Sequence, residues 1–384
     1  MTGSSHIIIG LGGIGSAVAF HLATRGEAVL GFDSHPARHR HGSSHGETRL
    51  VRQAYFEGKD YVPLARRAWS LWKELERAAG THLLTQSGVL VAGPEADPRR
   101  MVDRVVGAAR EFDLPYEMLG SDKIRERFPG FSLPAAWDAV LEPVAGYVNP
   151  ELAIEAHCRL AEEAGASLMR NETVEQIDWA GGVKVKTNRG TYSADKLIIA
   201  VGPWAPEFLK EARLPLVARR KVVAHFDPIE TGALGPDKFP GFFLSLDSGE
   251  FYGFPYQQGQ GVKIARHDGG DNCTPGTIDR AVSDSETDEL RGVLNDYVPA
   301  ASGRLRDAYT CMYTMTPDQH FVVDAHPNHA DCWIATGCSG HAFKFTSVLG
   351  EVLADMAVGA SPKCDIGFLS ASRFPRAASV DGKR

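Results

Sequence analysis

The first 33 residues show three successive patterns, each typical of a different element. The apolar run HIIIG predicts a buried strand, the glycine-rich LGGIG that follows predicts a tight turn opening a helix, and EAVLGFD predicts a second strand. A strand, a helix and a strand in this order form a βαβ unit. We therefore expect an α/β fold that begins at the N-terminus.

Three further segments have the spacing of apolar residues, or the terminating residues, that are typical of helices. Residues 61–79 place apolar side chains on one face and charged ones on the other. Other helices are expected at about 98–112, ending before Pro115, and at about 150–165. Between the first two, GVLVAG predicts a strand, so 83–149 has a mixed pattern.

Later segments predict strands of two kinds. Residues 183–187 alternate, and the apolar KLIIAVG at 196–202 is typical of a buried parallel strand. Residues 216–325 are rich in aromatic, alternating stretches, which favour an antiparallel sheet. CWIATG at 332–337 predicts a short buried strand, followed by a helix that starts near Phe345.

These patterns predict a two-domain α/β (α+β) protein, as the length of 384 residues also indicates. A Rossmann-type nucleotide-binding domain is expected in three pieces, 1–82, 150–215 and 326–384. A substrate domain with a mixed or antiparallel β-sheet is expected from 83–149 and 216–325.

Composition narrows the possible partners. The chain is 43% hydrophobic with no 18-residue apolar run, and its net charge of -7 comes with no long basic run, so neither a membrane nor a nucleic acid is expected. The six cysteines form no CxxC pair, which favours free thiols in a reducing, cytoplasmic compartment and gives no reason to expect a metal. A small molecule is the expected ligand of a monomer or small homo-oligomer.

A dinucleotide fingerprint lies in the first βαβ unit. Gly10, Gly12 and Gly15 form GxGxxG between the strand and the helix, and Asp33 ends the second strand. The glycines permit a tight turn, close approach of a pyrophosphate and helix packing, while Asp33 can bind a ribose. A purely structural turn is the alternative, and the fingerprint does not decide between FAD and NAD.

Three later motifs carry a more specific resemblance. HGSSHGETRLVRQAYFEGKDYVPLA at 41–65 is dense in polar and charged residues, CMYT stands at 311–314, and TGCSGHAFKFTS stands at 336–347. With the fingerprint, they closely resemble the monomeric sarcosine oxidase and N-methyltryptophan oxidase family, within the D-amino-acid-oxidase-like amine oxidases. The resemblance extends over nearly the whole chain and keeps the order of the motifs.

The resemblance implies FAD joined through its 8α-methyl group to Cys311. It places catalytic residues at and around the flavin and the substrate cavity, and it assigns the substrate carboxylate to two cations. The implied catalytic residues are His45, Arg49, Lys263, His267 and Tyr313; the substrate-binding residues are Arg52, Lys344 and Tyr252. Besides the fingerprint, the implied cofactor contacts are Ser43, Ser44, Thr48, Val174, Cys311, Gly337, Gly340, His341 and Lys344.

Each role has a structural alternative. Arg52 and Lys344 offer charges suited to a carboxylate but are also typical solvated surface cations. His267 and His341 are each equally compatible with structural histidines. Strand alternation slightly favours a solvent-facing Lys263, because Val262 and Ile264 would point inward.

Two positions depart from the family pattern. Glu47 stands where the family usually has Asp, and Ala342 stands where it usually has Gly. An alanine would strain position 342 if it required a positive φ or a very close approach to the flavin.

The reaction implied by the resemblance is oxidation of a secondary or N-methyl amino acid, with oxygen as acceptor. Sarcosine is the first candidate, and N-methyltryptophan, pipecolate or proline, and fructosyl amino acids remain open. A dehydrogenase with another acceptor, an NAD-dependent enzyme and a non-catalytic binding protein are the rival interpretations.

Overall fold

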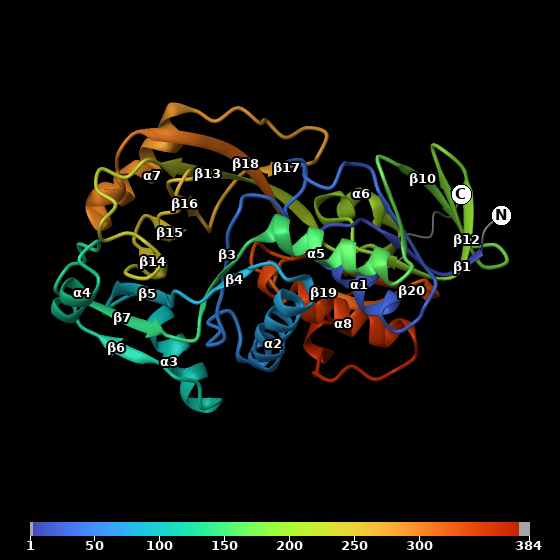
Figure 1. Cartoon of the computed structure of the whole chain (residues 1–384), viewed down its shortest axis with the longest axis horizontal. Helices are drawn as coiled ribbons and strands as arrows, with labels where there is room; N and C mark the ends of the chain where they lie inside the picture. Colours follow the sequence, from blue (N-terminus) through green and yellow to red (C-terminus); the bar gives the residue numbers. More distant parts are fainter. Residues whose placement is uncertain (1–2, 376–384) are drawn as a thin grey trace, which may run out of the picture.

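The structure is a computed structural model that describes residues 3–375. Two large sheets lie along the long axis of the molecule and form two lobes, with β1 and β12 in one and β5 to β7 in the other (Figure 1). The helices are α1 (Gly13–Ala23), α2 (Val62–Ala79), α3 (Met101–Glu111), α4 (Ser121–Arg127), α5 (Pro150–Glu163), α6 (Ala205–Phe208), α7 (Asp284–Tyr297) and α8 (Thr346–Ala357).

An eight-stranded sheet forms the first lobe and contains the expected βαβ unit. Its parallel strands run β20-β12-β1-β2-β9, and antiparallel strands extend it beside β12 and β20. Helices α1, α5 and α8 pack together beside it. The strands are β1 (Gly3–Ile9), β2 (Val29–Asp33), β9 (Ser167–Arg170), β10 (Val174–Asp178), β11 (Val183–Thr187), β12 (Thr191–Ile199), β19 (Val322–His326) and β20 (His329–Thr336).

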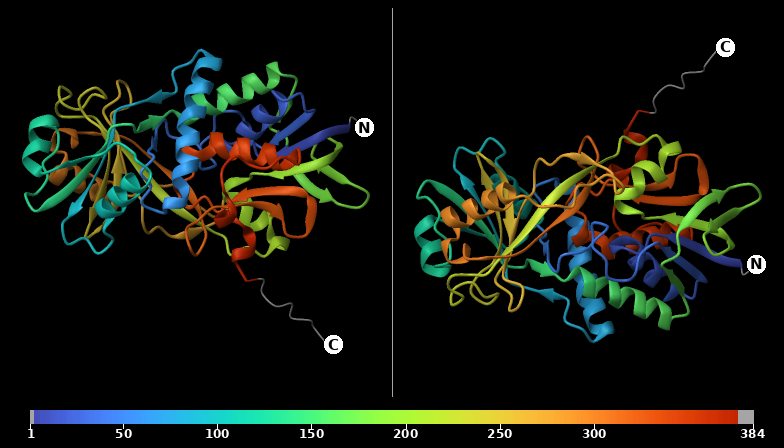
Figure 2. Two further views of the ribbon diagram at one scale, coloured as in Figure 1. Left: turned by 90° about the horizontal axis from the view of Figure 1, so that it is seen from below. Right: turned by 90° about the horizontal axis from the view of Figure 1, so that it is seen from above.

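A nine-stranded sheet forms the second lobe. It is mixed, because β14 pairs parallel with β5, whereas its other pairs are antiparallel. The long strands β13 and β18 reach toward the first lobe (Figure 2). The strands are β5 (Val89–Pro94), β6 (Glu117–Leu119), β7 (Trp137–Glu142), β13 (Val217–Phe226), β14 (Gly241–Leu246), β15 (Gly249–Gly253), β16 (Val262–Arg266), β17 (Asn272–Cys273) and β18 (Leu305–Met315).

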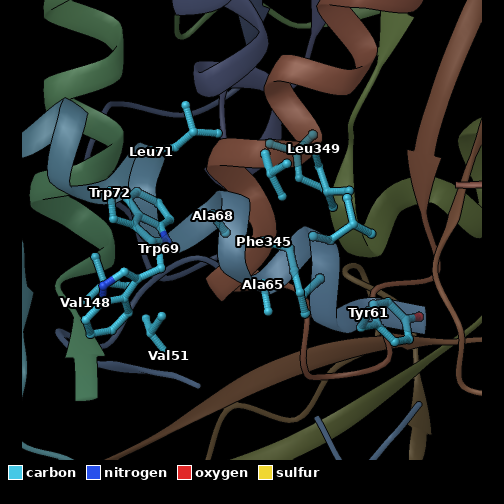
Figure 3. Close-up of a cluster of buried hydrophobic side chains, with 14 of the residues drawn as sticks. Val51, Tyr61, Ala65, Ala68, Trp69, Leu71, Trp72, Val148, Phe345 and Leu349 are labelled. Carbon is cyan, nitrogen blue, oxygen red and sulfur yellow. The ribbon is translucent and has the colours of Figure 1, made fainter. Parts of the chain in front are cut away.

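A small sheet and helix α2 lie between the lobes. The sheet consists of β3 (Arg49–Val51), β8 (Gly146–Val148) and β4 (Leu84–Thr85). The apolar face of α2 packs on α8, and Figure 3 shows Ala65 and Ala68 near Leu349. Trp72 of this face is fully buried and donates its Nε1–H to the Lys344 carbonyl at 2.8 Å, so the core fixes backbone that borders the site.

The α/β class, the predicted helices and the predicted strands are confirmed, with differences at their ends. All of β19 except its last residue falls within the segment expected for the substrate domain, yet the strand pairs with β20 in the first sheet, so the chain returns to that sheet before residue 326. All six cysteines are free. Within residues 3–375, no helix has both the length and the apolar character needed to cross a bilayer. The tail beyond Pro375 is outside the described residues.

Candidate active site

A cavity of about 350 Å³ runs through the region where the two lobes meet. One end is bordered by Gly10, Asp33 and Val174 of the nucleotide-binding lobe, and the other by Cys311 and Lys344. The carboxyl ends of β1 and β2 open into it, which is where parallel sheets place their ligands. Its lining therefore joins the glycine fingerprint to the cysteine and the buried lysine.

The glycine fingerprint has the geometry that its residues require. Gly10 has a φ of +91°, and a Cβ there would lie 2.5 Å from the Ala200 carbonyl oxygen. A Cβ on Gly15 would lie 1.8 Å from the Gly10 carbonyl oxygen, so only glycine lets α1 pack on β1 this closely. Asp33 accepts from the N–H groups of Leu11 and His35, both at 2.9 Å, which holds its carboxylate at the cavity wall.

The segment after β2 lies across this end of the cavity. Ser44 accepts from the Gly13 N–H at the start of α1 (3.3 Å), and Ser43 donates to the Met312 carbonyl (2.6 Å). Arg49 folds back on the same segment and donates to the carbonyls of Ser43, His45 and Thr48. The segment thus joins the helix N-terminus to β18, and its polar atoms border the cavity.

Cys311 lies on β18 at the cavity wall. It is opposite Lys221 of β13 in the antiparallel register, and its side chain is 5% exposed. Its Sγ lies 3.9 Å from the carbonyl oxygens of Ser43 and Met312. The thiol is therefore held beside the cavity by both lobes.

Arg52 is buried and forms an ion pair with Glu57. The guanidinium donates to both carboxylate oxygens, one of them at 2.6 Å, and its centre lies 3.7 Å from the ring centroid of Phe56. Both charged side chains line the cavity. The alternative that Arg52 is a solvated surface cation is wrong.

Lys344 starts a chain of buried polar contacts. Its Nζ donates to the His341 carbonyl (2.9 Å) and to the Tyr55 hydroxyl (3.3 Å). His341 Nε2 lies 2.9 Å from the Gln319 carbonyl, which assigns the proton to Nε2 and makes Nδ1 the acceptor from Tyr55 at 2.7 Å. Burial and, next to it, the charge of Arg52 lower the pKa of Lys344 to about 7, and burial lowers that of His341 to about 4.

His341 therefore has both ring nitrogens satisfied within the protein, as its structural interpretation predicted. It still lines the cavity and fixes Tyr55, which contacts Lys344. Its carbonyl oxygen also accepts directly from Lys344.

Two tyrosines and a histidine form the wall beyond Cys311. The hydroxyls of Tyr252 and Tyr313 lie 3.4 Å apart, and the ring of His267 is 5.7 Å from that of Tyr313. Burial lowers the pKa of His267 to about 3, so its ring is neutral near pH 7. Gly340 has a φ of +82°, and a Cβ there would be 2.2 Å from the Tyr313 ring, so glycine is required at this contact.

Lys263 is 3% exposed, so the solvent-facing alternative is wrong. Its Nζ donates to the carbonyls of Gly46 (2.6 Å) and Thr48 (2.9 Å) and lies 3.3 Å from the Thr48 hydroxyl. His45 is buried nearby with no hydrogen-bond partner for either ring nitrogen among residues 3–375. Burial lowers the pKa of His45 to about 3 and that of Lys263 well below its usual range.

Most of the residues expected at the site line this one cavity. Five do not reach it: a Cβ on Gly15 would meet the Gly10 backbone and one on Gly337 the Thr316 side chain, while His45, Thr48 and Lys263 form a buried layer behind it. Those that line it are Gly10, Gly12, Asp33, Ser43, Ser44, Arg49, Arg52, Val174, Tyr252, His267, Cys311, Tyr313, Gly340, His341 and Lys344.

Three residues were missed by the sequence analysis. Glu57 and Lys221 line the cavity, and Tyr55 joins Lys344 to His341. The motif containing Arg52 also contains Tyr55 and Glu57, so close spacing to an arginine was the available signal for both. Lys221 had no comparable signal, because it follows two arginines and resembles a charged strand edge.

The departure at Ala342 causes no backbone strain. Ala342 has a φ of −84°, whereas the positive φ values in this loop belong to Gly337, Ser339 and Gly340. Helix α8 begins at Thr346, which lines the cavity, so its positive N-terminal end faces the site.

Two groups of side chains within residues 3–375 have ligand atoms close enough for a metal, although none was expected. One is Asp33 with His35 and His39 at the cavity, and the other is Glu211 with His326 and His329. The Nδ1 of His326 accepts from the Asn328 N–H at 3.2 Å, which favours a proton on the Nε2 that a metal would need. We assign no metal to either group.

The fold and the cavity together define a dinucleotide-binding protein of the Rossmann type. The model of the FAD dependent oxidoreductase family matches residues 5–356, and the chain belongs to this family. It is 40% identical over 372 residues to a monomeric sarcosine oxidase of Bacillus sp. (strain B-0618), covering 96% of this chain and 95% of that protein.

Other relatives agree with this assignment. An N-methyl-L-tryptophan oxidase of Yersinia pestis (strain Pestoides F) is 36% identical, covering 96% of this chain and 98% of that protein. Among solved structures, NikD, an unusual amino acid oxidase essential for nikkomycin biosynthesis, superimposes over 100% of both chains with a TM-score of 0.86 and 26% identity.

Proposed function

We propose that this protein is an oxidase of secondary or N-methyl amino acids that carries FAD covalently on Cys311, with sarcosine as its first candidate substrate. The observation that carries the proposal is the cavity itself, with a dinucleotide fingerprint at one end and buried Arg52 and Lys344 at the other. The similarity to enzymes named monomeric sarcosine oxidase supports the choice of substrate.

The residues present fit FAD. A Cβ on Gly12 would meet only the Ser44 hydroxyl, 3.5 Å away, so the backbone at the start of α1 is open to a pyrophosphate. Asp33 would hold the ribose, and Cys311 would hold the ring system. FAD supplies the redox chemistry when bound, taking two electrons and a hydrogen from the amine carbon and returning the electrons to oxygen.

The protein would hold the substrate by its carboxylate. Arg52 offers a planar fork and Lys344 a point charge, and their burial strengthens both contacts. The amine and its N-methyl carbon would then lie against Tyr252, Tyr313 and His267, a wall that keeps water away from the reacting carbon. The neutral ring of His267 can accept a proton or a hydrogen bond there.

The overall reaction balances with oxygen as acceptor. Sarcosine, oxygen and water give glycine, formaldehyde and hydrogen peroxide, because the imine that leaves is hydrolysed. Lys263 would provide positive charge where oxygen is reduced. Free thiols are also consistent with a cytoplasmic enzyme.

An anaerobic reduction screen tests this function. The flavin absorbance of the purified protein should bleach with sarcosine or another N-substituted amino acid and return on admission of oxygen with one equivalent of peroxide. Bleaching without rapid reoxidation by oxygen would show a dehydrogenase. A colourless protein, or a flavin that no amine bleaches, would contradict the proposal.

A further inference from the structure

Lys221 is a buried cation in the cavity wall that has no role in the mechanism above. It lies on β13 with 5% of its surface exposed, and its Nζ is 5.0 Å from the ring centroid of Tyr313. The ammonium donates to the carbonyls of Asp268 (2.5 Å) and Gly269 (2.9 Å). Two of its three N–H groups are thereby used, and one is left for the cavity side.

No carboxylate among residues 3–375 forms an ion pair with Lys221. The carboxylate of Asp268 is held instead by Arg266, at 2.9 Å, and by the Glu250 N–H. Burial lowers the pKa of Lys221 to about 8, and Arg219 and Arg266 add to this effect, whereas the nearby carboxylates of Asp268 and Glu250 oppose it without full compensation. Arg52 differs, because Glu57 neutralises it. An anion bound at Lys221 would restore the missing counter-charge.

An aromatic wall joins Lys221 to Arg52. Each ring lies close to the next, with centroid separations of 5.0, 5.5 and 5.7 Å. Arg52 stacks on the first ring and Lys221 on the last. In order, the rings are Phe56, Phe243, His267 and Tyr313. Phe243, His267 and Tyr313 line the cavity together with both cations, so it has a buried cation at each end of a largely aromatic surface.

We propose that Lys221 binds a second anionic group of the substrate, so that the preferred substrates are N-substituted amino acids with a further carboxylate on the side chain or the N-substituent. This inference rests on the proposed function, in which Arg52 and Lys344 bind the α-carboxylate. The second carboxylate would extend along the aromatic wall to Lys221. Hydroxyl groups could accept its free N–H but would not neutralise a buried ammonium, so a carboxylate is favoured.

The test of specificity uses an isosteric pair of substrates. N-methylglutamate and N-methylglutamine differ only by the charge of the side-chain group, and the ratio of their kcat/KM values at pH 7 is the readout. We expect a ratio above 10 in the wild type that falls toward 1 in Lys221→Met. Lys184→Met removes the same charge from an exposed site on β11 and should keep the wild-type ratio.

A binding measurement separates this inference from the proposed function. Calorimetric titration of the purified flavoprotein should give at least tenfold tighter binding of glutarate than of butanoate, and Lys221→Met should remove the difference. If no amine bleaches the flavin but this pattern holds, the proposed function fails and the Lys221 site stands. If the wild type binds both acids alike, or the variant keeps the preference, the inference is overturned.

A second measurement covers a variant that fails to fold. Because the pKa of Lys221 is about 8, raising the pH from 7 to 9.5 should lower the affinity of the wild type for glutarate toward its affinity for butanoate. A preference that stays constant over this range would exclude Lys221 as the anion-binding group. The visible flavin spectrum and the thermal midpoint report whether each variant is folded.

Discussion

The guanidinium of Arg52 donates to both carboxylate oxygens of Glu57, five residues further along the chain. Burial alone would raise the pKa of Glu57, but Arg52, with help from His341 and Lys344, outweighs burial and lowers it to about 2. Glu57 is therefore ionised at neutral pH. A substrate carboxylate must share the guanidinium with Glu57 or displace it.

Replacing Glu57 by Gln should tighten the binding of simple carboxylates by about tenfold, because a charged competitor for Arg52 is removed. The same change leaves Arg52 without a counter-ion, so the free energy of unfolding without ligand should fall by about 3 to 5 kcal/mol. Acetate titration followed by the flavin spectrum, and urea unfolding, measure the two effects.

The matched change on the other side of the pair is Arg52→Met. It should weaken carboxylate binding by about 2 to 4 kcal/mol while FAD stays bound. If Arg52→Met binds acetate as tightly as the wild type does, Arg52 does not bind the substrate carboxylate.

Carboxylate binding should depend on pH through Lys344. Burial, with Arg52, lowers the pKa of Lys344 to about 7, so its ammonium is present below pH 7 and is lost above it. Acetate affinity should fall by up to tenfold per pH unit above 7, and Lys344→Met should bind weakly with no such slope. Glu142 also titrates near pH 7, because burial raises its pKa. The pH dependence of acetate affinity should persist in Glu142→Gln. If it is lost in that variant, the titrating group is Glu142 and not Lys344.

The parts of the fold that the sequence predicted correctly depend on local patterns. The turn at Gly10 and the packing at Gly15 are set by backbone geometry within a few residues, so their spacing is sufficient to predict them. The return of the chain through β19 depends on pairing with β20, and the apolar Val322 and Val323 fit either sheet. The boundary at 326 therefore had no local signal.

The site residues that were missed or uncertain depend on distant contacts. Strand alternation places Lys263 outward, but residues 46–48 cover that face and supply its acceptors. Lys221 looks like a solvated strand residue until the β13–β18 register sets it opposite Cys311. Periodicity shows which face of a strand a residue occupies. Whether that face is exposed to solvent depends on which other segment of the chain packs over it.

The flavin should be attached to Cys311 and to no other cavity cysteine. Burial raises the pKa of Cys338 to about 12 and that of Cys158 to about 11, which suppresses the thiolate that such a bond needs. After acid precipitation the yellow colour should stay with the pellet in wild type and Cys338→Ala, and move to the supernatant in Cys311→Ala. Free FAD from the wild type would contradict a covalent link.

The buried layer behind the cavity supplies the final prediction. Lys263 and His45 lie behind Arg49, and the acceptors of Lys263 belong to the same segment that carries Arg49. Lys263 can therefore act in two ways, as a positive charge or as a tether for residues 46–48. The two half-reactions separate these roles, because only the oxygen reaction creates a localised anion.

Lys263→Met should slow reoxidation of the reduced enzyme by about two orders of magnitude or more and slow anaerobic reduction far less. The first electron transferred to oxygen creates negative charge in a site with little water, and a fixed ammonium stabilises it without rearranging solvent. Met has a similar length without the charge, whereas Lys263→Arg keeps the charge with a different reach and should retain part of the oxygen rate. Stopped-flow absorbance measures both half-reactions. Equal slowing of both half-reactions would show that Lys263 acts as a tether for residues 46–48. If both rates are unchanged, another group supplies the positive charge, and Arg49 is the next to test.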